Sequence, residues 1–242
     1  MELKGKAAIV TGGAVRLGRA LAVALAEAGV DVCVHYGRSA DAARETVAEI
    51  ERLGPRAVAV QADLADPAVA ARRVVTRAVA ELGRIDVLVN SAAIFEPGTL
   101  AGTTEQQWDR HFAINLKAPF FLAQAFVAAL GPQSRGHIVN VADWRGLRHP
   151  PGHAAYTLAK SGLIAMTRLL AVELAPRVQV NAIAPGLILP PAGADAAFLA
   201  QLAQAVPLRR PGSPADVVAA LLYLLRSDFV TGDVLEVTGG QG

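Results

Sequence analysis

The sequence predicts an α/β fold, a doubly wound sheet of seven mostly parallel strands with helices on both of its faces. Two observations lead to this prediction. Short apolar runs without polar alternation recur along the 242 residues, as strands that are covered on both faces require. Longer alanine-rich stretches separate these runs, and strands that alternate with helices form right-handed βαβ units. We expect a single domain over 1–242, because 53% of the chain is hydrophobic and supplies one sizeable core.

Each element follows from its own stretch of sequence. Seven apolar runs predict strands, in order at 6–10 (KAAIV), 31–35 (DVCVH), 57–61 (AVAVQ), 86–90 (DVLVN), 137–141 (HIVNV), 178–183 (VQVNAI) and 234–237 (VLEV). The alanine-rich stretches between them predict helices near 17–28, 40–53, 67–82, 104–130 with a break, 154–174 and 214–226. The proline-rich segment at about 186–213 interrupts this alternation, and such an insertion is commonly a substrate loop.

Composition and charge argue against several kinds of partner. The sequence has 23 Lys and Arg against 21 Asp and Glu, a net charge of +2 without a basic run, which argues against nucleic acid and anionic membranes. No apolar stretch reaches the roughly 18–20 residues that span a bilayer. The first residues, MELKGKAAIV, lack the apolar segment of a secretory signal, so we expect a cytoplasmic protein. The single cysteine, Cys33, excludes an intrachain disulfide and is expected in the core.

A glycine-containing turn, TGGAVRLG, joins the first strand to the first helix. A strand, a turn and a helix in this order place free backbone N–H groups and the positive end of the helix at one spot, where a pyrophosphate binds. Gly12 and Gly18 hold the first and last glycine positions, and Leu17 lies beside the last. Arg16 stands at the middle position, where it either binds an anion or is simply a solvated arginine.

The end of the second strand indicates which dinucleotide is bound. NAD-preferring enzymes place an Asp or Glu there, roughly 20 residues past the glycines, to hold the ribose 2′-hydroxyl. This chain has HYGRS instead, with His35 and Tyr36 followed by Arg38 and Ser39. There is no acid to repel a 2′-phosphate, and Arg16, Arg38 and Ser39 are able to donate to one, so the sequence favours NADPH. Tyr36 packs either near the adenosine or in the core.

The third and fourth strands end in further candidates for cofactor contacts. Asp63, followed by Leu64, is either a cap for the helix over 67–82 or an acceptor for the adenine amine. The NSA segment after the fourth strand is expected to lie close to the cofactor through Asn90, Ser91 and Ala92.

Tyr156 and Lys160 open the long helix over 154–174, with a spacing of i, i+4 that places them on one helix face. A phenol ordinarily has a pKa near 10. A neighbouring ammonium, helped by the positive charge of a nicotinamide, is expected to lower the pKa of Tyr156 and make it a proton donor. The pattern gains weight from its place downstream of the glycine turn and from Asn115 in the preceding helix.

With these motifs the chain resembles a classical short-chain dehydrogenase/reductase over its whole length. The resemblance implies a Rossmann fold, a homotetramer, and an active site in which Tyr156 is the acid. It also implies that Lys160 orients the ribose and tunes Tyr156, and that Asn115 holds a water in a proton relay. The pair Pro185-Gly186 matches the family, but the threonine that usually follows is missing. Contact to the nicotinamide amide then falls to the backbone of Leu187 or Ile188.

The chain departs from the general family at Asp143, which stands 13 residues before Tyr156, where the family has a serine. An ionised aspartate repels a developing oxyanion, so a plain ketone reductase fits poorly. It suits a substrate that presents N–H donors or needs a proton on a ring nitrogen; the alternative is a loop aspartate that caps a neighbouring group. Together with Arg16 and the HYGRS segment at 35–39, Asp143 makes the chain similar to the pteridine reductase subgroup and its dihydromonapterin/dihydrofolate reductase branch.

The pteridine reductase resemblance implies that Phe95 stacks a pterin against the nicotinamide and that Arg16 helps to fix it. Phe95 read by itself is a loop anchor. The leading hypothesis is an NADPH-dependent pteridine reductase that acts on a pterin or folate. One alternative is an NADPH-dependent carbonyl reductase of the 3-oxoacyl or sugar type. Another is a non-catalytic NADP(H)-binding redox sensor, against which the complete catalytic set argues. No metal site is predicted, because the histidines lack metal-ligand spacing.

Overall fold

The computed structural model describes residues 1–190 and 196–241, and its seven strands form one parallel sheet in the order β3-β2-β1-β4-β5-β6-β7. The predicted doubly wound sheet is thereby confirmed, with every pair of neighbouring strands parallel. The chain winds outward from β1 in one direction and from β4 in the other, so the strand order reverses between them. The strands are β1 (Ala7–Thr11), β2 (Asp31–Tyr36), β3 (Ala57–Gln61), β4 (Val87–Asn90), β5 (Gly136–Val141), β6 (Val178–Pro185) and β7 (Val234–Val237).

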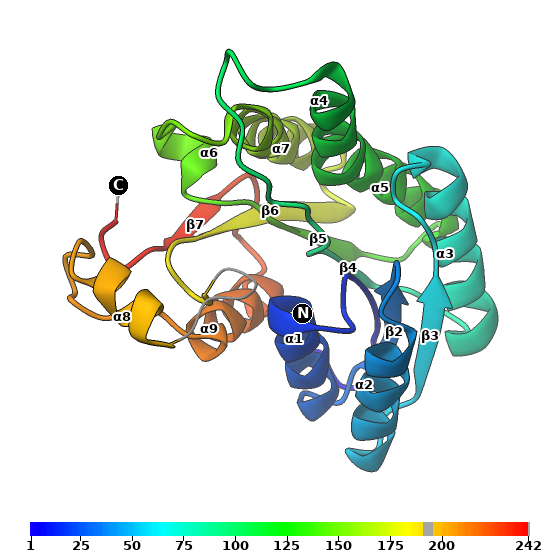
Figure 1. Cartoon of the computed structure of the whole chain (residues 1–242). Helices are drawn as coiled ribbons and strands as arrows, with labels where there is room; N and C mark the ends of the chain where they lie inside the picture. Colours follow the sequence, from blue (N-terminus) through cyan, green and yellow to red (C-terminus); the bar gives the residue numbers. More distant parts are fainter. Residues whose placement is uncertain (191–195, 242) are drawn as a thin grey trace.

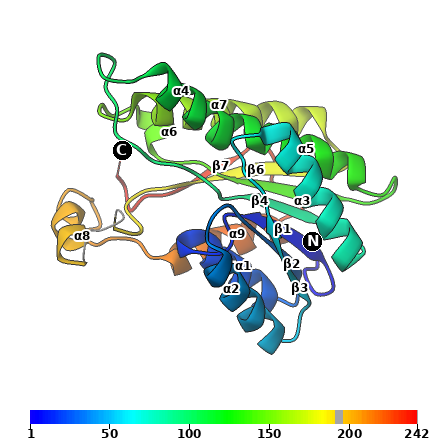
Figure 2. The same ribbon diagram turned by 45° about the vertical axis from the view of Figure 1, so that its right-hand side comes forward.

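Helices cover both faces of the sheet (Figures 1 and 2). One layer consists of α1 (Arg16–Glu27), α2 (Ala40–Arg52) and α9 (Pro214–Arg226). The other layer contains α3 (Pro67–Leu82), α4 (Glu105–Phe112), α5 (Ala118–Ala129) and α7 (Ala154–Glu173). Each layer has its own apolar core, and β1 shows why: Ile9 packs into one core while Val10, next along the strand, packs into the other.

The predicted break in the helix over 104–130 is a π-helical turn, η1 (Ala113–Lys117), between α4 and α5. Such turns are rare and are found frequently at functional sites. By length and composition alone, the continuous run Glu105–Ala129 is long and apolar enough to cross a membrane: its most apolar 18 residues have a mean hydropathy of 1.4, and 33% of them are buried. No such stretch was expected from the sequence. The run joins three helical pieces, and its Leu122 and Phe126 are buried in the core that also contains residues of α3.

Two short helices were not anticipated. Helix α6 (Arg145–Arg148) lies between β5 and α7, and α8 (Ala196–Ala203) lies inside the predicted substrate loop. Figure 2 shows α8 standing apart from both helix layers. Residues 191–195 of that predicted loop lie outside the described part of the chain.

Gly18 gives a first test of the glycine turn. A Cβ at this position would lie 2.1 Å from the backbone oxygen of Gly12, so α1 packs against the turn only if residue 18 has no side chain. Gly18→Ala is expected to lower the free energy of unfolding by about 1–3 kcal/mol, the usual effect of overpacking, and to weaken dinucleotide binding. Urea titration measures the first effect. Gly37→Ala is the control, since nothing lies within 4 Å of its Cβ position; equal losses in both variants would contradict the close approach.

Candidate active site

A groove of about 890 Å³ runs along the carboxyl ends of the strands, from the glycine turn to Tyr156. In open parallel sheets ligands bind at this edge, where the strand order reverses. Most of the predicted site residues line it: Gly12, Arg16, Leu17, Gly18, His35, Arg38, Asp63, Leu64, Ser91, Ala92, Phe95, Asp143, Tyr156, Lys160, Pro185, Gly186 and Ile188. The other predicted residues do not line the groove: Tyr36, Ser39, Asn90 and Asn115.

The glycine turn presents backbone donors to the groove. Helix α1 begins without a capping side chain and without an acidic residue in its first turn, which leaves its first N–H groups to a ligand. Gly12 has a φ of +64° and packs so closely on Ala92 that a Cβ would lie 3.0 Å from the Ala92 Cα. Arg16 has a φ of +51°, the conformation that glycine adopts readily and an L-residue adopts at a cost of about 1–2 kcal/mol.

His35, at the end of β2, holds the glycine turn through a hydrogen bond. Its Nδ1 accepts a hydrogen bond from the Gly12 N–H (3.2 Å), so its other ring nitrogen, Nε2, carries the proton and donates to the Ala62 oxygen (3.1 Å). Burial lowers the pKa of His35, which keeps the ring neutral and in this tautomer. His35 therefore positions the glycine turn, a role that the sequence did not reveal. Its contact with the cofactor stays a prediction.

The residues proposed for the 2′-phosphate are not equally placed. Arg16 and Arg38 line the groove, and the Arg16 guanidinium donates to the Pro190 oxygen (2.6 Å), across the groove from the turn. Ser39 is exposed at the start of α2. Tyr36 is half-buried against the core on the side of α1 and α2, in line with the packing role in the core rather than a place near the adenosine.

Asp63 does not cap α3, because the residue at the start of that helix is Asp66. Its Oδ1 accepts the Ala65 N–H (2.9 Å), and its side chain remains on the groove wall, which leaves the predicted adenine contact available. Asn90 is buried and donates to the Oδ1 of Asn140 (2.8 Å), so its side chain ties two neighbouring strands together.

Asn115 lies in the π-helical turn and is fully buried. Its side-chain amide accepts from the Ile94 N–H and donates to the Ile94 oxygen, both at 3.0 Å. The amide therefore holds the segment that carries Phe95. The water that the resemblance implies for Asn115 stays a prediction.

Tyr156 and Asp143 form a hydrogen-bonded pair at the end of the groove. The Tyr156 hydroxyl donates to Oδ2 of Asp143 (2.8 Å), while Oδ1 accepts the backbone N–H of Arg145 (2.8 Å). One oxygen of Asp143 thus caps the backbone at the start of α6, as the alternative expected, and the other contacts the tyrosine. Its contact with a substrate stays a prediction. The end of β5 supplies Asp143 and the first turn of α7 supplies Tyr156, which is why residues 13 apart meet.

Burial raises the pKa of Tyr156 well above 10, and the charge and hydrogen bond of Asp143 raise it further. The sequence analysis expected the opposite direction, because it considered Lys160 and not the carboxylate beside the phenol. Burial also raises the pKa of Asp143, although the hydrogen bonds from Arg145 and Tyr156 and the charge of Lys160 oppose that shift. In the protein alone, the pair holds its phenolic proton tightly.

Lys160 is buried, and its ammonium donates to the Val141 oxygen (2.6 Å). Its Nζ lies 5.8 Å from the centre of the Tyr156 ring. Burial lowers the pKa of Lys160 to about 8, and the charge of Asp143 opposes this shift. The ammonium thus lies one helical turn from Tyr156, as the spacing predicted.

Phe95 forms the centre of an aromatic cluster at the mouth of the groove. Its ring stacks on the imidazole of His153 (4.2 Å between ring centres, 8° between planes) and meets Tyr156 edge to face (4.7 Å). A flat substrate therefore finds one face of Phe95 already covered by His153. The ring is 48% exposed, so its remaining surface is accessible.

Several residues in or beside the groove were not predicted from the sequence. Thr11 accepts hydrogen bonds from the N–H groups of Ser91 and Ala92 (3.0 and 3.1 Å), which joins the NSA segment to the glycine turn. Arg145 lines the groove, yet no motif marks it. Leu202 and Ala205 line it too, near the end of the insertion that the proline-rich composition indicated.

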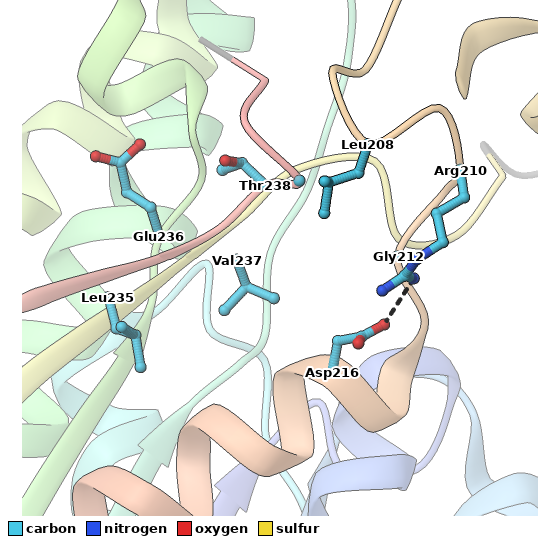
Figure 3. A pocket seen from close by; sticks show the side chains of 9 residues that line it. Leu208, Arg210, Gly212, Asp216, Leu235, Glu236, Val237 and Thr238 are labelled. Atoms are coloured by element: carbon cyan, nitrogen blue, oxygen red, sulfur yellow. Dashed lines mark ion pairs between the residues drawn. The ribbon is translucent and has the colours of Figure 1, made fainter. Parts of the chain in front are cut away.

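A second, smaller hollow of about 260 Å³ lies beside β7 (Figure 3) and shares no lining residue with the groove. Arg210 on its rim pairs with Asp216 (3.6 Å), and the same carboxylate closes a capping box with Ser213 at the start of α9. Its charged side chains have partners within the protein, because Glu236 on the same hollow pairs with Arg148. In the described residues no group of three or more His, Cys, Asp or Glu side chains is placed to hold a metal ion.

The groove has a glycine turn with free backbone donors at one end and a buried tyrosine–lysine pair at the other. Together these two features define a class of protein, the nicotinamide-dependent oxidoreductases. The comparisons then give the family. A family model described as enoyl-(acyl carrier protein) reductase matches residues 13–241. The chain belongs to the short-chain dehydrogenase/reductase family.

The relatives differ in what they act on. An uncharacterized oxidoreductase of Mycobacterium tuberculosis is 41% identical over 247 residues, covering 99% of this chain and 93% of that protein. The 3-oxoacyl-[acyl-carrier-protein] reductase FabG of Staphylococcus epidermidis is 34% identical over 241 residues, covering 98% of each. The structure of FolM alternative dihydrofolate reductase 1 from Brucella canis, complexed with NADP, has a TM-score of 0.94 at 35% identity, covering 99% of this chain and 95% of that chain.

These matches confirm the prediction of an oxidoreductase that uses NADPH. They do not decide between a pterin and a carbonyl substrate, because reductases of both kinds are among them.

Proposed function

We propose that the protein is an NADPH-dependent pteridine reductase, which reduces a C=N bond of a dihydropterin or dihydrofolate. The observation that carries this proposal is the contact between the Tyr156 hydroxyl and the Asp143 carboxylate, 2.8 Å apart at the end of the groove. A carboxylate here accepts hydrogen bonds from the N–H groups of a pterin ring and repels the oxyanion of a ketone reduction. The likeness to FolM supports the same substrate class.

The residues of the groove fit NADPH. The uncapped start of α1 leaves backbone donors for a pyrophosphate, and the missing side chain of Gly12 lets the turn pack against Ala92. Arg38 is exposed on the groove wall, and no carboxylate follows β2 to repel a 2′-phosphate. Arg16, across from Pro190, is placed to contact both the phosphates and the substrate loop.

The cofactor, when bound, supplies a hydride to the carbon of the C=N bond. The protein's part is to orient the substrate and to deliver a proton to the nitrogen. Tyr156 Oη holds that proton in its hydrogen bond to Asp143, and Asp143 fixes the direction of the hydroxyl. Lys160, held by the Val141 oxygen, keeps a positive charge beside the ring that favours release of the proton. Phe95 offers to the flat ring of the substrate the part of its surface that His153 and Arg145 leave exposed.

The second candidate is an NADPH-dependent 3-oxoacyl or sugar reductase, and the FabG relatives favour it. The two candidates differ in what residue 143 must do. A carbonyl reductase needs a hydrogen-bond donor to the substrate oxygen, whereas the proposed reaction uses an acceptor for ring N–H groups.

Asp143→Ser separates the two. We expect the wild-type protein to oxidise NADPH with 7,8-dihydrobiopterin, dihydromonapterin or dihydrofolate. The variant is expected to lose about 100-fold of this activity and to gain reduction of an acetoacetyl thioester. NADPH absorbance is followed with each substrate, and NADH serves as the cofactor control. Turnover of the thioester alone by the wild-type protein contradicts the proposal and favours the carbonyl reductase.

We also propose that the enzyme is a cytoplasmic homotetramer. Apolar side chains remain exposed on α5 and α7, among them Phe120, Leu158, Leu169 and Val172, the last 82% exposed. Exposed apolar patches mark sites of association, and we propose that this one binds other copies of the chain. Light scattering is expected to give the mass of four 25.1-kDa chains; a monomer mass contradicts the tetramer.

A further inference from the structure

The arginines that line the groove differ in whether their guanidinium groups have partners within the protein. Four arginines line it, and two of them already have partners: Arg16 donates to the Pro190 oxygen, and Arg110 pairs with Glu96. Arg38 lies at the end where the cofactor's 2′-phosphate is proposed to bind. Arg145 lies at the other end, beside Asp143 and Tyr156, and no carboxylate in the described part of the chain comes within ion-pair distance of its guanidinium.

Aromatic rings hold the Arg145 side chain in place. Its guanidinium carbon lies 5.1 Å from the centre of the Trp144 ring and 5.7 Å from that of Phe95. Its backbone N–H donates to Asp143, which fixes the main chain beneath it. Cation–π contacts engage the faces of a guanidinium and leave the N–H groups at its edge available. The side chain is half-buried, so its charge acts in an environment less polar than water.

The charge of Arg145 is felt by its neighbours. It lowers the pKa of His153, after the larger effect of burial, and it opposes the rise in the pKa of Asp143. Glu96, the acid next to Phe95, is occupied by Arg110 and does not neutralise Arg145. A substrate that passes Phe95 on its way to Tyr156 therefore meets a guanidinium that no ion pair among the described residues neutralises.

Two arginines outside the groove, Arg148 and Arg210, each have a carboxylate partner. Arg148 lies on the same short helix as Arg145 but does not line the groove, and it pairs with Glu236 (3.3 Å). Arg210, on the rim of the smaller hollow, pairs with Asp216 (Figure 3). Arg145 is thus held in a fixed position at the substrate end, with its hydrogen-bond donors still to be satisfied.

We propose that Arg145 is the residue that determines specificity for an anionic substituent on the substrate. Its planar fork suits a carboxylate or a phosphate, which it binds through two parallel hydrogen bonds. This inference rests on the proposed function and deepens it: among reduced pterins, the enzyme favours one that carries carboxylates, as dihydrofolate does, over one with a neutral side chain. The same anion site on a carbonyl reductase takes the phosphates of a coenzyme A thioester.

Arg145→Gln tests the inference, with Arg148→Gln as the matched control on the same helix. With saturating NADPH, we expect the KM for dihydrofolate to rise about 10- to 100-fold in Arg145→Gln, with little change in kcat. The KM for neutral dihydromonapterin is expected to change less than about two-fold. Arg148→Gln is expected to leave both values unchanged. Arg145→Lys keeps the charge without the planar fork and is expected to recover part of the affinity.

Binding is measured apart from turnover. p-Aminobenzoylglutamate carries the carboxylates of folate without its pterin ring, and p-aminobenzamide is its neutral counterpart. Calorimetry is expected to detect the glutamate compound with the wild-type protein and to show binding weakened at least ten-fold in Arg145→Gln. The Arg145→Lys variant carries the test if Arg145→Gln fails to fold.

The outcomes separate this inference from the function on which it rests. Equal changes in KM for dihydrofolate and dihydromonapterin, or no change in either, overturn the role of Arg145 while the pteridine reductase stands. If the wild-type protein reduces no pterin, the proposed function fails and acetoacetyl coenzyme A becomes the deciding substrate. A rise in its KM in Arg145→Gln then supports an anion site for phosphate, and an unchanged KM overturns the site altogether.

Discussion

Tyr156→Phe is expected to lower kcat about 10³-fold with the preferred substrate, while the affinity for NADPH changes less than about two-fold. The variant keeps the ring that packs against Phe95 and loses only the hydroxyl that Asp143 holds. General acid catalysis is worth about 10²–10⁴-fold, and Tyr156 is the proposed proton donor. Steady-state kinetics give kcat, and fluorescence titration with NADPH gives the affinity.

Tyr223→Phe is the matched control, because Tyr223 lies on α9 and is 54% exposed. It is expected to behave as the wild-type protein does. A Tyr156→Phe variant that retains activity within ten-fold would show that the proton comes from Asp143 or from water. Burial raises the pKa of Asp143, so this carboxyl group binds a proton more tightly than an exposed one does, and Asp143 is the alternative donor.

The fold could be predicted because its signals are local. A buried parallel strand is apolar on both faces, as AAIVT of β1 is, and this is visible in five residues. The turn that follows is marked by Gly12 and Gly18; Gly18 is required by the backbone of Gly12 within the same stretch, whereas Gly12 is required by the distant Ala92. The order of the elements then limits the topology, because crossovers between parallel strands are right-handed.

The site could be predicted only where a motif names a residue. Tyr156 and Lys160 lie one turn apart, so their proximity follows from the helix. The direction of the Tyr156 pKa shift did not follow, because it depends first on burial of the phenol and then on Asp143, which reaches the phenol from the segment after β5. The same holds for His153, which covers one face of Phe95 although the two residues are far apart in sequence.

Lys160 gives the second large effect, a dependence of stability on pH. Burial lowers its pKa from 10.5 to about 8, so the folded protein binds this proton less tightly than the unfolded chain does. Between pH 8 and pH 10.5 the unfolded chain therefore holds more protons, and the free energy of unfolding rises with pH. The penalty for burying the ammonium is fully present below pH 8 and disappears as the lysine of the unfolded chain also loses its proton.

Comparison with Lys160→Met isolates this effect, because methionine fills a similar space without a titratable group. The difference in the free energy of unfolding, wild type minus variant, is expected to rise by about 2–3 kcal/mol from pH 7 to pH 10, measured by urea titration without cofactor. Lys4→Met, at an exposed position, is expected to show no such rise. A flat difference for Lys160→Met would mean that water or a counter-charge reaches the ammonium. It would also remove the reason to expect that Lys160 acts on Tyr156 as a poorly solvated, and therefore strong, positive charge.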